Sequence, residues 1–377
     1  MTALSALSYT RIRTLFNPPE VAAVEGSNPV RIGLLGAARI APAAIIRPAK
    51  LIPSEAVIYA VAARDKARAT EFATTHGIEK VYTTYEELLA DPAVEMVYNA
   101  LPISLHMEWT LKAVEAGKHV LLEKPCAMDS EQARATFAAA KAKGVLVMEA
   151  FHWYFHPANQ LVKRIVSDEA TFGKPTFYEG HLCVGLGRFS DDSDIRFVFN
   201  LGGGSTMDTG CYPISWMRYF LAEEPTAAKL LELIVSPKDE RIDEYVSYEF
   251  SFADPAKKAL VHTGLRTPLT KLLKHGLVTS VTIRSDKKEL FFRLSIMPHL
   301  YHSITVKDLA TGKKESFSGY EAGREHWTTY TYQLKAFCER VRGGDPGLWF
   351  ENENSVKNME AIEMAYKAAA LPVRHSG

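Results

Sequence analysis

The sequence predicts an α/β fold with two domains: a doubly wound parallel sheet, followed by an α/β domain with an open, mostly antiparallel sheet. The length of 377 residues fits two domains. Up to about residue 151, nearly all-apolar strands alternate with helical segments, the pattern of a parallel sheet covered on both faces. After about residue 152, strands follow one another with turn residues between them, and several alternate apolar and polar side chains, which favours antiparallel pairing.

The first domain is predicted over residues 30–152, after an N-terminal arm of residues 1–29. Its predicted strands are 31–36, 56–64, 94–102, 119–125 and 145–151, and its predicted helices are 42–52, 65–77, 104–117 and 129–144. Right-handed crossovers between such units produce a Rossmann fold, whose ligand lies at the carboxyl ends of the strands. We therefore expect functional residues in the loops that follow the strands.

The second domain is predicted over residues 153–377. Its predicted strands are 175–185, 245–253, 258–265, 278–285, 288–295 and 302–309. Two long helices, at roughly 325–342 and 353–369, end the chain and could pack back on the first domain.

The balance of charge argues against nucleic acid or a membrane surface as the partner. Lys and Arg number 44, as do Asp and Glu, and no stretch approaches about 18 uninterrupted apolar residues. The four cysteines are far apart and form no paired motif, so we expect reduced thiols in a cytoplasmic protein and no metal site. The N-terminal arm lacks the apolar core of a signal peptide, and its first acidic residue is Glu20, which leaves a mitochondrial presequence as an alternative.

The stretch GLLGAARIAP, residues 33–42, has the pattern of a first strand and its dinucleotide-binding turn. Aligned to G-x-G-x-x-G/A, it places Gly36, Ala38 and Ala41 at the three small positions. The methyl group of Ala38 stands where a glycine usually lets the backbone approach a pyrophosphate. By itself the turn fits a cofactor loop and an ordinary strand–helix turn equally well.

The end of the second predicted strand favours NADP over NAD. An NAD site usually has an acidic residue there to accept hydrogen bonds from the ribose 2′-hydroxyl, whereas this strand ends in Arg64, with Asp65 one step later. A guanidinium can bind a 2′-phosphate with two parallel hydrogen bonds and stack on adenine. The alternative is a solvated arginine at the start of a helix.

The motif GKHVLLEKP places Glu123, Lys124 and Pro125 at the end of an apolar strand. Because an unpaired buried ammonium is costly, Lys124 is expected to face a partner or a cleft. Pro125 could hold the peptide in a fixed geometry, with a cis bond as one form. A structural salt bridge between Glu123 and Lys124 is the alternative.

The motif LGGGSTMDTGCYP, residues 201–213, offers a second chemical group. Its three glycines allow the backbone to approach a ligand or another domain, and Asp208 and Tyr212 share one face if the segment is helical. For Tyr212 to act as a base near pH 7, its pKa must fall by about 3, which takes roughly 4 kcal/mol from nearby positive charge. A core tyrosine with a satisfied hydroxyl fits the spacing as well.

Together these segments resemble the Gfo/Idh/MocA family of glucose–fructose oxidoreductase and inositol dehydrogenase. The resemblance covers the chain from about residue 30 and rests on the order of RIGLLGAARIAP, VAARD, YEELLADPAVEMVYNALPISLH, AGKHVLLEKPCAMD, VLVMEAFHWYFHP, GGGSTMDTGCYP and NSVKNMEAI. The chain is most similar to the branch of NADP-dependent D-xylose 1-dehydrogenases and dimeric trans-dihydrodiol dehydrogenases. The resemblance implies a Rossmann domain, a C-terminal domain with an open sheet, and a homodimer formed through that sheet.

The resemblance also implies roles for individual residues. Lys124 matches the lysine that orients and polarises substrate, Tyr212 the acid/base, and Asp208 an acidic residue on the substrate side. The candidate cofactor-binding residues are Gly36, Ala38, Arg39, Ile40, Arg64, Leu101, Pro102, His106, Glu123 and Lys124.

The implied activity is NADP-dependent hydride transfer at a hydroxyl-bearing ring carbon of a sugar or a related cyclic diol. Tyr154 departs from the family pattern, because many relatives have an arginine there that contacts cofactor or substrate. This departure keeps open a dehydrogenase or reductase of a dihydrodiol or non-sugar ketone. The resemblance also allows a non-catalytic NADP-responsive regulator, because the family fold includes such proteins. The lysine together with the DxxxY pair favours an enzyme.

Overall fold

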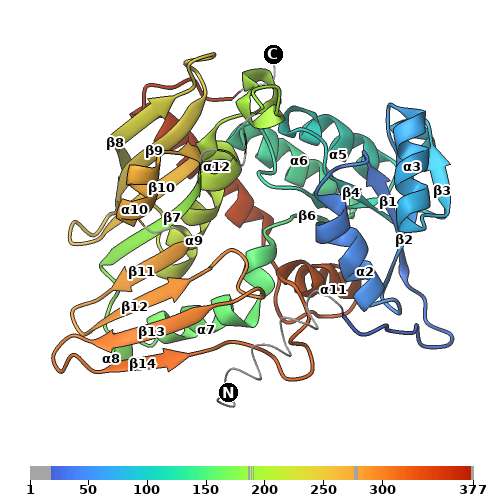
Figure 1. Cartoon of the computed structure of the whole chain (residues 1–377). Helices are drawn as coiled ribbons and strands as arrows, with labels where there is room; N and C mark the ends of the chain where they lie inside the picture. Colours follow the sequence, from blue (N-terminus) through green and yellow to red (C-terminus); the bar gives the residue numbers. More distant parts are fainter. Residues whose placement is uncertain (1–17, 186, 188, 190, 276–278, 375–377) are drawn as a thin grey trace. The chain divides into compact units, whose positions relative to one another are not determined.

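The computed structural model describes residues 18–185, 187, 189, 191–275 and 279–374, and it divides into two compact units (Figure 1). The first unit holds the described residues up to Cys126, together with Gln132–His156 and Tyr320–Asn352. The second holds Ala127–Glu131, Pro157–Gly319 and the described residues from Glu353 on.

The first unit contains a parallel sheet of six strands. The strands are β1 (Val30–Leu35), β2 (Ala56–Ala62), β3 (Lys80–Tyr82), β4 (Met96–Asn99), β5 (His119–Leu122) and β6 (Val147–Glu149). Their spatial order, β3-β2-β1-β4-β5-β6, is that of a Rossmann fold and confirms the predicted doubly wound sheet. The chain reverses its winding between β1 and β4, which is where such folds bind their ligands.

The first unit also contains helices and helical turns. They are a π-helical turn η1 (Pro42–Ile46), α2 (Arg47–Leu51), α3 (Lys66–His76), α4 (Tyr85–Ala90), a 3₁₀ turn η2 (Ile103–Leu105), α5 (His106–Glu115), α6 (Ser130–Lys143), a 3₁₀ turn η3 (His152–Phe155) and α11 (Thr329–Val341). The predicted helix 42–52 is two segments, because Pro48 has no N–H to donate within the first turns of α2. The short elements β3 and α4 were not predicted; Thr84 begins α4 with a capping box.

The second unit contains a mixed sheet of eight strands. The strands are β7 (Phe177–Gly185), β8 (Ala227–Val235), β9 (Asp243–Ser251), β10 (Lys258–Thr267), β11 (Ser280–Arg284), β12 (Lys288–Arg293), β13 (Ser303–Asp308) and β14 (Lys314–Phe317). Their order is β14-β13-β12-β11-β7-β10-β9-β8, and every pair is antiparallel except β7 with β10. The predicted mostly antiparallel sheet is confirmed, although β8 and β14 at its two edges were not predicted.

The second unit also contains helices and helical turns. They are α7 (Pro157–Ser167), α8 (Glu169–Phe172), the 3₁₀ turns η4 (Ile195–Phe197) and η5 (Phe199–Leu201), a π-helical turn η6 (Thr206–Gly210), α9 (Cys211–Leu221), α10 (Leu269–His275) and α12 (Asn352–Ala368). Helix α9 packs against β7 and β10, and Tyr178 of β7 donates from its hydroxyl to the carbonyl oxygen of Pro213 at 2.9 Å. Almost every residue of α9 is buried, so its position is strongly determined by packing.

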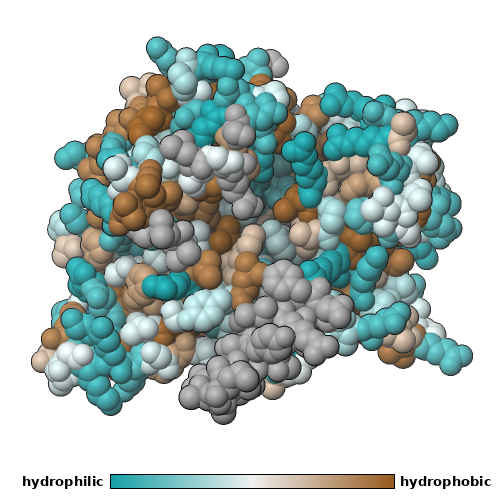
Figure 2. All heavy atoms as spheres, in the orientation of Figure 1, coloured by the Kyte–Doolittle hydropathy of each residue, from teal (hydrophilic) through white to brown (hydrophobic). Residues whose placement is uncertain are grey.

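Apolar side chains remain exposed on the edge strand β8 and on helix α10, which packs against the inner strands β7 and β10. Leu231 of β8 is 46% exposed, and Leu269 and Leu273 of α10 are 60% and 67% exposed. Figure 2 shows hydrophobic surface in the region of β8 and α10. An ion pair between Lys271 and Glu232 joins this helix to the edge strand.

The predicted N-terminal arm is described only from residue 18, and residues 1–17 lie outside the described residues. Residues 18–29 form no helix or strand and are mostly exposed, with the Val24 amide donating to Ser54 Oγ at 2.8 Å. No helix among the described residues has the length and apolar character needed to cross a membrane.

Candidate active site

The turn after β1 is shaped by a glycine that cannot readily be replaced. Gly36 has a φ of +89°, and a Cβ there would lie 3.2 Å from Leu101 Cδ2. Ala38 does not have a positive φ, so its backbone conformation does not require glycine. Arg39 and Ile40 are exposed at the tip of the turn, where they are accessible to a ligand.

Two arginines follow β2, Arg64 in the loop and Arg68 in the first turn of α3. Arg64 is exposed, and Arg68 donates from Nη2 to the carbonyl oxygen of Ala37 at 2.8 Å. Asp65 accepts a hydrogen bond of 3.1 Å from the backbone N–H of Arg68, which makes it the N-cap of α3. Burial raises the pKa of the nearby Tyr85 hydroxyl, while the charges of Arg64 and Arg68 oppose that rise. The local charge available to a ligand is therefore positive.

The loop after β4 is held by buried polar groups. Asn99, fully buried, accepts from the Leu101 amide at 3.3 Å and donates to Thr110 Oγ1 at 3.1 Å. His106 is 1% exposed, with Nε2 2.9 Å from the Leu101 carbonyl oxygen and Nδ1 3.0 Å from the Pro125 carbonyl oxygen. The ring of His106 therefore joins two loops, and both of its nitrogens face backbone oxygens. Pro102 is half-buried in the same loop.

Burial keeps His106 neutral. It lowers the pKa of this imidazole to about 4, against the opposite effect of the hydrogen bonds to the Leu101 and Pro125 carbonyls. The charge of Lys124 lowers it further. Because a neutral imidazole has one N–H, it donates to one of the two carbonyl oxygens at a time.

The EKP motif follows β5 directly. Tyr98 donates from its hydroxyl to Glu123 Oε1 at 2.5 Å, and the Lys124 amide donates to Glu123 Oε2 at 3.2 Å. The Lys124–Pro125 peptide bond is cis. The amide of Cys126 donates to Glu149 Oε1 at 2.9 Å. These hydrogen bonds hold Glu123 and Cys126, the residues on either side of the Lys124–Pro125 pair, in place.

The second unit holds Asp208 in the π-helical turn η6 and Tyr212 in the first turn of α9. Arg196 donates from Nε to Asp208 Oδ2 at 2.9 Å and from Nη1 to Asp194 Oδ1 at 3.0 Å. Tyr212 is 5% exposed, and its ring centroid lies 6.1 Å from that of Trp216. A π-helical turn at this point widens the helix, a feature often found at functional sites.

Tyr154 lies among aromatic rings within the first unit. Its ring centroid is 5.2 Å from that of Phe350, in an edge-to-face arrangement, and 5.4 Å from that of Phe155. Burial, together with the charge of Glu351, raises the pKa of the Tyr154 hydroxyl. Tyr154, where the family resemblance leads us to expect an arginine, is thus part of an aromatic cluster.

Sequence reasoning missed three contributors: Arg68, Arg196 and Asn99. Arg68 follows Arg64 by four residues, so a second arginine near the end of β2 could be read from the sequence. Arg196 lies in the 3₁₀ turn η4, 12 residues before Asp208, and no local pattern links the two. Asn99 stands within a predicted apolar strand, where a buried amide signals a specific partner.

Two family descriptions match this chain. "Oxidoreductase family, NAD-binding Rossmann fold" matches residues 30–151, and "GFO/IDH/MocA C-terminal domain" matches residues 159–275. The chain belongs to the GFO/IDH/MocA oxidoreductase family. The resemblance inferred from the motifs is confirmed, and the chain is an NAD(P)-dependent oxidoreductase.

Relatives within the GFO/IDH/MocA family are similar over most of the chain. D-xylose 1-dehydrogenase (NADP⁺) 2 from Haloferax volcanii is 30% identical, over 89% of this chain and 96% of the relative. Trans-1,2-dihydrobenzene-1,2-diol dehydrogenase from Xenopus tropicalis is 28% identical, over 67% and 75% respectively. The solved structure of a 3-ketoreductase from Actinomadura kijaniata with NADP and TDP-benzene has a TM-score of 0.76 and 25% identity, over 90% of this chain and 98% of that one.

Proposed function

We propose that this family member is an NADP-dependent oxidoreductase that transfers hydride between nicotinamide and a hydroxyl-bearing ring carbon of a sugar or related cyclic diol. The observation that carries the cofactor assignment is the end of β2, where Arg64 is exposed while Asp65 is engaged as a helix cap. The similar D-xylose dehydrogenase and the similar 3-ketoreductase, which are named with NADP, support the same choice.

The residues around the β1 turn fit a dinucleotide. Gly36 supplies the positive φ that turns the chain beneath Leu101, and the exposed residues Arg39 and Ile40 border the turn. Arg64 and Arg68 provide two guanidinium groups for a 2′-phosphate, a ligand that arginine binds with paired, charge-assisted hydrogen bonds. Leu101, Pro102 and the EKP segment follow β4 and β5, the strands across the reversal of winding.

The bound nicotinamide supplies hydride transfer chemistry, and the protein supplies orientation and proton transfer. Lys124 donates a hydrogen bond to the substrate oxygen and stabilises its negative charge. Tyr212 takes the proton of the same hydroxyl during oxidation and returns it during reduction. Asp208, held by Arg196 at 2.9 Å, binds a neighbouring substrate hydroxyl.

A less polar substrate is a second candidate. The edge-to-face contact between Tyr154 and Phe350 places aromatic carbon where many family members carry a guanidinium. A dihydrodiol presents fewer hydroxyl groups than a sugar and suits such surroundings, and a dihydrodiol dehydrogenase is among the relatives.

We also propose that the protein is a cytoplasmic homodimer formed through the sheet of the second unit. The exposed leucines, Leu231 on the edge strand β8 and Leu269 and Leu273 on helix α10, support an apolar interface on this unit. The free thiols Cys183 and Cys338 support a reducing compartment.

A substrate panel tests the proposal. Purified protein is incubated with aldoses, inositols or trans-dihydrodiols, each with NADP or NAD, and the reduced cofactor is followed by absorbance. Turnover of at least one ring hydroxyl with a clear preference for NADP is expected. In the Arg64→Ala variant the preference should shrink about 10- to 100-fold through weaker NADP binding, whereas Lys50→Ala, which removes an exposed charge from α2, should leave it unchanged. Equal use of NAD and NADP by the unaltered protein would contradict the cofactor assignment.

A further inference from the structure

We propose that Arg374, near the C-terminus, is a positioning residue that holds the segment bearing Asp208 and Tyr212. Its guanidinium binds the glycine-rich stretch immediately before these residues, within the second unit. The inference rests on the proposed catalytic role of Tyr212, and it adds a distant part of the chain to the catalytic apparatus.

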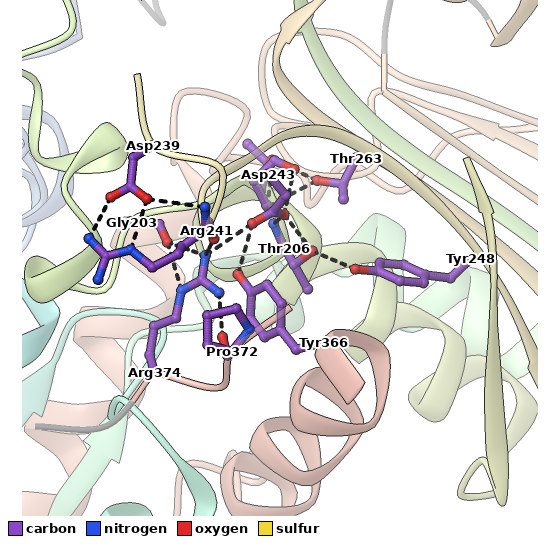
Figure 3. Close-up of polar contacts among 12 residues, drawn as sticks. Gly203, Thr206, Asp239, Arg241, Asp243, Tyr248, Thr263, Tyr366, Pro372 and Arg374 are labelled. Atoms are coloured by element: carbon purple, nitrogen blue, oxygen red, sulfur yellow. Dashed lines mark hydrogen bonds and ion pairs between the residues drawn. The ribbon is translucent and has the colours of Figure 1, made fainter. Parts of the chain in front are cut away.

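Arg374 is fully buried and makes contacts in several directions (Figure 3). Its Nε and Nη2 atoms donate to the carbonyl oxygen of Gly203 at 3.0 and 2.8 Å. Nη2 also donates to the carbonyl oxygen of Arg241 at 3.1 Å, and Nη1 to that of Pro372 at 2.8 Å. The guanidinium carbon lies 4.0 Å from the centre of the Tyr366 ring. A planar group with five N–H donors suits this arrangement, and an ammonium cannot reproduce it.

Asp243 completes the clamp from the start of β9. Its Oδ1 atom accepts from Arg374 at 3.2 Å and from the Tyr366 hydroxyl at 3.2 Å. Its Oδ2 atom accepts from Ser205 Oγ at 2.9 Å, from the Thr206 amide at 2.6 Å and from Thr206 Oγ1 at 2.7 Å. The two charged groups are both fully buried and neutralise each other while binding neighbouring residues between Gly203 and Thr206.

The glycines of this loop make room for the clamp. Gly204 has a φ of +126°, and a Cβ there would lie under 3.0 Å from side-chain atoms of Asp243, Arg374 and Tyr366. The sequence suggested that these glycines allow approach to a ligand or another domain. At Gly204 the close neighbours are instead charged and polar side chains of the same unit.

The clamped residues lead directly into the proposed catalytic residues. The carbonyl oxygen of Gly204 accepts from the Asp208 amide at 3.1 Å, and that of Ser205 accepts from Thr209 Oγ1 at 3.0 Å. Tyr212 follows in the next helical turn. A displacement of residues 203–206 would therefore tilt the start of the helical segment on which both functional side chains stand. Misplacement by about 1 Å is enough to lower turnover by about two orders of magnitude.

The test compares Arg374→Lys and Arg374→Ala with Arg284→Ala, whose side chain forms an exposed ion pair with Glu289 in the same unit. Three quantities are measured in the full-length protein: kcat and KM for the substrate that the panel identifies, NADPH binding by fluorescence, and hydrogen exchange of the amides in residues 203–212. Both Arg374 variants are expected to lower kcat by about tenfold or more, to leave NADPH binding unchanged, and to speed exchange in this segment. Arg284→Ala should match the unaltered protein.

Chemical rescue separates positioning from a general loss of folding. Added guanidinium ion at millimolar concentration should restore part of the kcat of Arg374→Ala and slow its exchange in residues 203–212. If Arg374→Ala does not fold, Arg374→Lys decides the question alone. A folded Arg374 variant with kcat and exchange within twofold of the unaltered protein overturns the inference. Failure of the proposed function is distinguishable, because the unaltered protein would then turn over no substrate, while the exchange measurement still tests the clamp.

Discussion

Replacement of His106 by asparagine should make the protein less sensitive to acid. The folded state lowers the pKa of this imidazole from the ordinary 6.5 to about 4, chiefly through burial. Between these values the unfolded chain binds a proton that the folded chain does not, so the free energy of unfolding falls as the pH falls below about 6.5. The loss is about 2 kcal/mol between pH 8 and pH 5 and approaches about 3 kcal/mol below pH 4.

Asparagine does not titrate, and its amide can still donate to the carbonyl oxygen of Leu101 or Pro125. Urea unfolding at pH 8 and pH 5 gives the free energy of unfolding for the unaltered protein and for His106→Asn. The unaltered protein should lose about 2 kcal/mol more than the variant over this range. Carboxylates titrate in both proteins, so their contribution cancels in the comparison. Equal losses in the two proteins would refute the argument that His106 is buried in its neutral form.

Three further predictions concern single contacts. Gly36→Ala puts a Cβ 3.2 Å from Leu101 Cδ2 at a residue whose φ is positive. The variant should therefore lose about 1–2 kcal/mol of stability and bind NADPH more weakly. Unchanged NADPH binding in a fluorescence titration would count against the role of this turn. Asp65→Ala removes the N-cap of α3 and should lower the free energy of unfolding by about 1 kcal/mol without favouring NAD; a switch toward NAD in initial-rate assays would argue against the cofactor assignment. Arg196→Gln removes the charged partner of Asp208, so KM for the substrate should rise while KM for NADP stays unchanged. An equal rise of both KM values in steady-state kinetics would disprove a role of Arg196 at the substrate alone.

The fold was largely predictable because its signals are local. Apolar runs mark the central strands, and helix α3 is delimited by Asp65 as its N-cap and by Gly77 in the left-handed conformation as its C-cap. The edge strand β14 escaped prediction because its residues, KESF, are mostly polar and all exposed. The edge strand β8 escaped prediction for another reason: its sequence AAKLLELIV is rich in Ala, Leu, Lys and Glu, which favour a helix when isolated. The π-helical turns η1 and η6 depend on packing around them, which no short sequence pattern encodes.

The site was predictable only in part. Gly36, Lys124 and Tyr212 stand in motifs whose spacing carries information, so they could be proposed from the sequence. The contact of Arg374 with Asp243 joins residues 131 positions apart, and nothing in the residues around either one indicates the other. Long-range partners of this kind are decided by the tertiary fold, as is the meeting of His106 with the Pro125 carbonyl oxygen.

Turnover by Tyr212→Phe tests the central claim most directly. The variant removes one hydroxyl from a side chain that is 5% exposed, so it should fold and bind NADPH like the unaltered protein. Tyr219→Phe, on the same helix α9, removes a hydroxyl that donates to Gln160 and provides the matched control. We expect kcat to fall by about 10²- to 10⁴-fold for Tyr212→Phe alone, as for loss of a general acid–base group. A Tyr212→Phe variant with kcat equal to that of Tyr219→Phe would contradict the proposed mechanism.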